Sequence, residues 1–156
     1  MYRKIMLPLD GSPLAECVLP HIKTFMGGSE SPEIMLVRAV EPIAIPYGRE
    51  MAKVASVEQL KAFEAHNEAE AKDYLKEIEA RLGKTGANAR TYVIYGKAAD
   101  ALTDFAARNG VDLVVIATHG RSGISRWVWG SVADRLLRSI SAPVLMIRAP
   151  GCIPGI

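Results

Sequence analysis

Cysteine, an excess of one charge and long apolar runs are all scarce in this chain of 156 residues. Its two cysteines, Cys17 and Cys152, have no spacing typical of a metal site or a redox pair, so we expect reduced thiols. The formal net charge is only +2, with basic residues spread among acidic ones, which argues against nucleic-acid binding. No apolar run is long enough for a signal peptide or a membrane span, so we expect a cytoplasmic protein without membrane insertion.

Short apolar runs alternate with amphipathic stretches along the chain. With 49% hydrophobic residues, the chain is long enough for one domain with a proper core, over residues 1–148, followed by an irregular tail over 149–156. The predicted strands are 3–9, 33–40, 89–95, 113–116 and 143–147. The predicted helices are 12–26, 56–82, 98–108 and 131–140.

Several local signals set details of these elements. Ser12-Pro13 predicts the start of the first helix, which Pro20 should kink or break. The fourth helix should begin near Ser131, which can act as its N-cap. Its apolar residues at helical spacing are Val132, Leu136, Leu137 and Ile140.

The long second helix has one apolar face. That face should consist of Leu60, Phe63, Ala71, Leu75, Ile78 and Leu82. Gly83 is the expected C-cap of this helix, and Asn109-Gly110 is a C-cap signal for the third one. His66 has no second ligand at metal spacing, so we expect a solvated surface histidine.

Five strands alternating with four helices predict an open, five-stranded parallel α/β sheet with helices on both faces, a Rossmann-like fold. In such sheets, ligands bind beyond the carboxyl ends of the strands, where the winding direction reverses. If the strand order is 3-2-1-4-5, the reversal lies between strands one and four. Asp10 and His119, which end these two strands, should then face one another across a crevice.

The loop from His119 to Gly130 precedes a helix and offers a phosphate site. Gly130 stands just before Ser131, so bare backbone amides at the positive end of the helix dipole could hold an anion. The alternative is that these glycines serve only the turn.

Four short segments resemble the universal stress protein family, over roughly Tyr2 to Arg148. They are Pro8-Leu9-Asp10-Gly11-Ser12, Thr118-His119-Gly120-Arg121, Gly130-Ser131-Val132 and Ala142-Pro143-Val144. In the nucleotide-binding branch of that family, the pattern is glycine, two residues, glycine, nine residues, glycine, then serine or threonine. Here Gly120, Gly130 and Ser131 fit that pattern, whereas Ala117 replaces the first glycine.

The resemblance implies an ATP site, with Mg²⁺ bridging the phosphates. Asp10 would accept hydrogen bonds from the ribose hydroxyls. The backbone of Ala39 would meet the adenine edge, and Ala117 would lie beside the ribose. The base would be walled by Pro8, Leu9 and Ile116. The phosphates would be held by Gly120, Gly130, Ser131 and Val132, with a weaker case for Arg121.

Other interpretations of these residues stay open. Asp10 could cap the first helix or form a turn, and Ser131 could be only an N-cap. His119 more readily shapes the loop than acts as a base. Trp127 and Trp129 are better suited to covering the sheet or a partner subunit than to stacking on a base. Arg126 in the same loop is another candidate for a phosphate contact.

Three functions are compatible with the sequence. The first is an ATP-binding stress-response module with little or no hydrolysis and an unknown protein partner. The second is a dimeric scaffold without nucleotide binding, and the third is a slow ATPase or phosphotransferase. Strand 143–147 would be an exposed apolar edge, and related proteins pair such edges, so the resemblance implies a homodimer.

Overall fold

A computed structural model describes residues 2–26, 31–42, 57–118 and 131–148 of the chain. The predicted glycine loop and the tail lie outside these residues. Within them, no helix is both long and apolar enough to cross a membrane.

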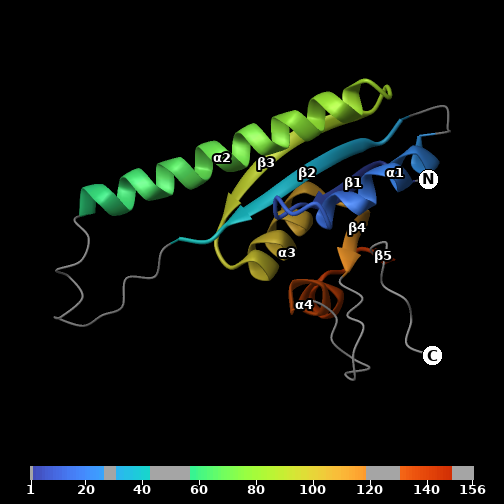
Figure 1. The fold of residues 1–156 in the computed structure, drawn as a ribbon. Helices are drawn as coiled ribbons and strands as arrows, with labels where there is room; N and C mark the ends of the chain where they lie inside the picture. Colours follow the sequence, from blue (N-terminus) through green and yellow to red (C-terminus); the bar gives the residue numbers. More distant parts are fainter. Residues whose placement is uncertain (1, 27–30, 43–56, 119–130, 149–156) are drawn as a thin grey trace, which may run out of the picture.

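The five strands form one sheet in the order β3-β2-β1-β4-β5, and every pairing between neighbours is parallel (Figure 1). Their bounds are Lys4–Pro8 for β1, Glu33–Val40 for β2, Asn88–Tyr95 for β3, Leu113–Thr118 for β4 and Val144–Arg148 for β5. This confirms the predicted sheet and strand order. The apolar runs reflect burial of both faces, because every central strand is covered from two sides.

Three regular helices follow the predicted ones closely: α2 Val57–Gly83, α3 Ala98–Asn109 and α4 Ser131–Ser139. The first predicted helix is instead broken into three short turns. They are the 3-10 helix η1 Ala15–Val18, α1 Leu19–Ile22 and the 3-10 helix η2 Lys23–Phe25. Pro20 lies in the first turn of α1, where a helix does not need the missing N–H. The break that Pro20 predicted is therefore confirmed.

Two apolar clusters cover the two faces of the sheet. The first packs α2 and the segment from η1 to α1 against one face, around side chains such as Ile5, Leu36 and Leu75. The second packs α3 and α4 against the other face, around Met6 and Leu136. Neighbouring strand residues alternate between the clusters. Because α2 belongs to the first cluster and α3 to the second, the helices change faces where the chain passes from β3 to β4. The winding reversal then falls between β1 and β4, as predicted.

Two expectations about helix residues were wrong. Phe63 is 53% exposed, because the apolar face of α2 is buried only where the sheet lies beneath it. Gly83 is the last residue of α2, and the positive φ of 83° belongs to Gly86, three residues later. Leu137, which the sequence named only for its helical spacing, is 46% exposed, since α4 buries the side that carries Leu136.

Other local signals hold. The backbone N–H of Ala15 donates to Ser12 Oγ at 3.2 Å, so Ser12 caps the first helical segment. Gly110 ends α3 in the left-handed conformation, with φ 64°. α4 begins at Ser131 itself, within one residue of the expected cap position. His66 is an exposed residue of α2.

Candidate functional site

A pocket of about 250 Å³ lies at the carboxyl ends of the central strands. Its walls come from the ends of β1, β2 and β4, the first turns of α3 and α4, and the segment just before η1. This is the point where the winding of the sheet reverses, the usual ligand site in open parallel sheets.

The pocket brings together the described residues that the sequence marked as a site. They are Pro8, Leu9, Asp10, Ala39, Ile116, Ala117, Ser131 and Val132. The remaining marked residues, Gly120, Arg121 and Gly130, lie outside the described part of the chain, as do His119, Arg126, Trp127 and Trp129.

The pocket is also lined by seven residues that were not predicted from the sequence. They are Leu14, Ala15, Val37, Ala98, Leu102, Thr118 and Ala133. Val37 could have been found, since it shares a strand face with Ala39 at a spacing of two. Ala98 and Leu102 share a helix face at a spacing of four, but nothing local indicates that this face lies over the strand ends.

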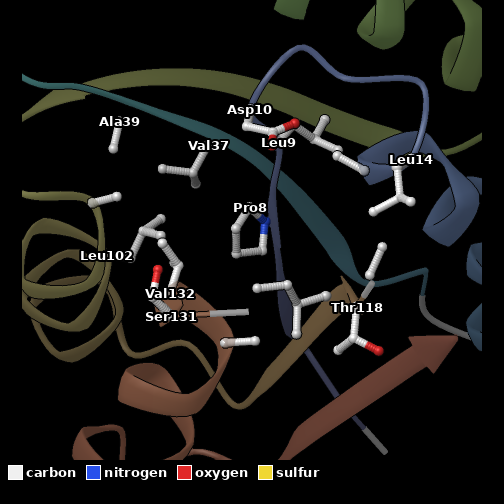
Figure 2. Close-up of a pocket in the computed structure, with 15 residues that line it drawn as sticks. Pro8, Leu9, Asp10, Leu14, Val37, Ala39, Leu102, Thr118, Ser131 and Val132 are labelled. Atoms are coloured by element: carbon white, nitrogen blue, oxygen red, sulfur yellow. The ribbon is translucent and has the colours of Figure 1, made fainter. Parts of the chain in front are cut away.

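The pocket is mostly apolar, with a few polar groups at its rim. Figure 2 shows Pro8 between Asp10 and the pair Ser131 and Val132, with Thr118 on a separate wall. Asp10 is the one residue with an ionisable side chain among the described residues of the lining. An apolar slot with convergent polar groups suits a flat organic ring that carries polar substituents.

Asp10 is exposed and is held in a tight turn. The backbone N–H of Ser12 donates to its Oδ1 at 2.8 Å, and Gly11 between them has φ 90°. A turn at Asp10 was one of the interpretations that the sequence allowed, and the structure contains it. Among the described residues Oδ2 has no hydrogen-bond partner, so the turn does not use the whole carboxylate.

Ser131 is exposed and is the first residue of α4. Because the first turn of a helix leaves backbone amides unpaired at the positive end of its dipole, this wall can hold an anion. The carboxylate of Asp10 and the N-terminus of α4 thus border the same apolar pocket.

The described residues contain no group of three His, Cys, Asp or Glu side chains that could hold a metal ion. Asp10 is the one carboxylate that the described lining residues offer to a divalent cation.

The profile of the universal stress protein family matches residues 1–148 of the sequence. The chain belongs to the universal stress protein family. Universal stress protein MJ0577 of Methanocaldococcus jannaschii is 26% identical over 95% of this chain and 96% of its own. A solved structure of MJ0577 superposes with a TM-score of 0.77 and 25% identity, covering 97% of this chain and 99% of that one.

Two further universal stress protein structures share the fold. One is a complex with cAMP, with a TM-score of 0.67 and 19% identity over 94% of this chain and 97% of that one. The other, from Arabidopsis thaliana, has AMP bound, with a TM-score of 0.66 and 16% identity over 96% of this chain and 93% of that one.

Proposed function

We propose that this universal stress protein is an ATP-binding regulatory module with little or no hydrolysis. The observation that carries the proposal is the pocket itself, where Asp10 and the start of α4 border an apolar slot at the winding reversal of the sheet. Adenine nucleotides in two family structures with the same fold support this ligand class.

Each wall of the pocket suits one part of the nucleotide. Pro8, Leu9 and Ile116 would enclose the adenine, with the backbone of Ala39 at its edge. Asp10 would accept hydrogen bonds from the ribose hydroxyls, as an exposed carboxylate does well.

The triphosphate would lie toward α4. The amides of Gly130, Ser131 and Val132, with Gly120 and the Ser131 hydroxyl, would hold the phosphate oxygens, and Arg121 would offset their charge. Mg²⁺ would be bound chiefly by phosphate oxygens, because Asp10 is the only carboxylate among the described lining residues.

The described lining also supports the proposal of low hydrolysis. A general base must lie within hydrogen-bond reach of the attacking water. The described lining offers only Asp10, which the proposal places beside the ribose. A weak ATPase is the alternative that this argument disfavours.

The edge strand β5 supports a homodimer. Among the described residues β5 pairs only with β4, and Leu145 on it is 37% exposed. An apolar edge with unpaired backbone groups needs a cover, and a second copy of β5 would supply it. We infer a cytoplasmic dimer whose further protein partner depends on nucleotide occupancy.

The test of the proposed function is to denature freshly purified protein and identify any released nucleotide by mass spectrometry, then to follow ATP turnover by the stripped protein. Release of an adenine nucleotide with no steady turnover supports the proposal. Rapid turnover would instead identify an ATPase. No release and no binding at millimolar Mg-ATP would favour the scaffold, with Ala117 as the departure to examine first.

A further inference from the structure

Arg38 lies on β2 directly beside the pocket wall but faces away from it. Its neighbours Val37 and Ala39 line the pocket, whereas the Arg38 side chain passes to the opposite face of the sheet, where it meets α2. The Arg38 side chain is only 19% exposed. Burial of a guanidinium costs free energy, because a cation is desolvated, so its contacts must compensate for that cost.

The guanidinium lies against Gly11, the middle residue of the turn that holds Asp10. A Cβ atom added to Gly11 would stand 3.1 Å from Arg38 Nη1, 3.2 Å from Cζ and 3.3 Å from Nη2. Three near-equal distances mean that the flat side of the guanidinium covers this residue. Gly11 therefore has two reasons to be glycine, the close approach of Arg38 and its positive φ of 90°.

Two residues of α2 hold Arg38 in this place. The Arg38 Cζ atom lies 5.4 Å from the centroid of the Tyr74 ring, within range of a cation–π contact. Glu70 Oε1 is 3.7 Å from Arg38 Nη2. The Arg38 guanidinium therefore contacts α2 on one side and Gly11 of the turn on the other.

The electrostatic surroundings of Tyr74 agree with this arrangement. Burial raises the pKa of Tyr74 to about 12, with Glu16 and Asp10 adding to the rise and Arg38 and Arg81 opposing it. Among the described residues, the buried Tyr74 hydroxyl has no hydrogen-bond partner. Asp10 and Arg38 are therefore both close enough to Tyr74 to act on its pKa.

The other supports of the turn lie at its two ends, and Gly11 is its middle residue. At the far end, the backbone N–H of Ala15 donates to Ser12 Oγ at 3.2 Å and to the Ser12 carbonyl at 3.1 Å. Hydrogen bonding between β1 and β2 ends with the backbone N–H of Leu9, which donates to the Val37 carbonyl at 2.9 Å. Beyond Leu9, the Asp10 carboxylate is fixed by the Ser12 amide and by the position of Gly11. A shift of Gly11 would therefore change the direction in which Asp10 presents its free oxygen.

We propose that Arg38 is a positioning residue for nucleotide binding, which supports the turn of Asp10, Gly11 and Ser12 from beneath and so aims the Asp10 carboxylate at the ribose. This inference rests on the proposed function. Arg38 itself does not touch the ligand; it acts through Gly11. The alternative is that Arg38 only fastens α2 to the sheet.

A mutant cycle with two ligands separates these roles. Mg-ATP and Mg-2′,3′-dideoxy-ATP, which lacks the ribose hydroxyls, are titrated into wild type, Asp10→Ala, Arg38→Met and the double variant. Arg38→Met should weaken ATP binding about tenfold and leave dideoxy-ATP binding unchanged, and the double variant should match Asp10→Ala. Equal losses for both ligands, or additive losses in the double variant, would overturn the proposal.

Three further variants sharpen the cycle. Arg90→Met removes a cation that pairs with Glu33 at 3.6 Å on the edge strand, and it should bind both ligands like wild type. Tyr74→Phe keeps the ring under Arg38 and should also retain affinity. Arg38→Lys keeps the charge but not the planar group, so it should recover only part of the lost affinity.

A measurement without ligand distinguishes failure of this inference from failure of the proposed function. By NMR relaxation of ligand-free protein, the order parameters of Gly11 and Ser12 should fall from about 0.85 in wild type to below about 0.6 in Arg38→Met, with β1 unchanged. Unchanged order parameters would refute support of the turn by Arg38. If wild type binds no nucleotide, the proposed function fails and positioning for binding fails with it, while relaxation still decides whether Arg38 holds the turn.

Discussion

Asp10, just after β1, and Ser131, at the start of α4, border the same pocket although they stand far apart in the sequence. One is an exposed carboxylate and the other a hydroxyl at the positive end of a helix dipole, so they suit different parts of one ligand. This pairing divides the proposed nucleotide into a ribose end and a phosphate end.

That division predicts different ligand dependence for two substitutions. Asp10→Ala should weaken the binding of both adenosine and ATP by about tenfold or more, because it removes a charged acceptor for the ribose hydroxyls. Ser131→Ala should weaken the binding of ATP by about fivefold and leave the binding of adenosine unchanged, because it removes one neutral donor to phosphate. Calorimetric titration with both ligands measures these effects. Equal losses of adenosine affinity in the two variants would contradict the assignment.

The stability of α2 should depend strongly on position along the helix. Leu75→Ala should lower the free energy of unfolding by about 2–5 kcal/mol, since Leu75 is fully buried against the sheet. Phe63→Ala should change it by less than about 0.5 kcal/mol, because Phe63 is 53% exposed. Urea unfolding followed by circular dichroism gives both values. A large cost at Phe63 would mean that this side chain is covered in solution.

Tyr74 should make the protein less stable in alkali. Burial, with Glu16 and Asp10, raises the pKa of Tyr74 to about 12 from the ordinary 10.0. The unfolded chain therefore loses this proton first as the pH rises. The stabilisation is complete below about pH 10 and is lost as the pH approaches about 12.

Tyr74→Phe removes this proton and is the matched control. Its urea midpoint should fall less than that of wild type between about pH 9 and about pH 11. Tyr92 and Tyr95, whose pKa values are also raised, remain in both proteins and cancel in the comparison. Identical midpoint changes in the two proteins would show that Tyr74 does not titrate as its surroundings require.

The β5 edge should determine the oligomeric state. Leu145→Lys places a charge on the exposed apolar edge and should convert a dimer into a monomer, as edge lysines oppose strand pairing. Lys substitution of Leu137, exposed on α4 rather than on the edge, is the control and should leave the dimer intact. Sedimentation velocity at micromolar concentration resolves the two species. A monomeric wild type would refute the dimer.

The sequence predicted the sheet because most of its strands contain short apolar runs, which can be recognised without knowledge of distant residues. Ile34 to Val37 is such a run, and both faces of it are buried. The winding rule then placed Asp10 and the end of β4 at one crevice, since parallel strands end at the same edge of the sheet.

What the sequence could not predict depends on how elements overlap in space. Periodicity gave the apolar face of α2 but not the point where the sheet beneath it ends, so Phe63 was wrongly expected to be buried. Leu102 lies on the buried side of α3, yet its place in the pocket depends on where α3 crosses the strand ends. Arg38 drew no attention, because its contacts with Gly11 and Tyr74 join three separate segments of the chain.

The most direct test of nucleotide binding in this pocket is a titration of Mg-ATP into stripped wild type, Ala39→Phe and Ala107→Phe. Ala39 lines the pocket, whereas Ala107 is exposed on α3 and adds the same bulk elsewhere. Wild type and Ala107→Phe should bind with equal affinity, and Ala39→Phe should lose binding while keeping the wild-type circular dichroism spectrum. Equal binding by all three proteins would place ATP outside this pocket, and binding by none would contradict the account.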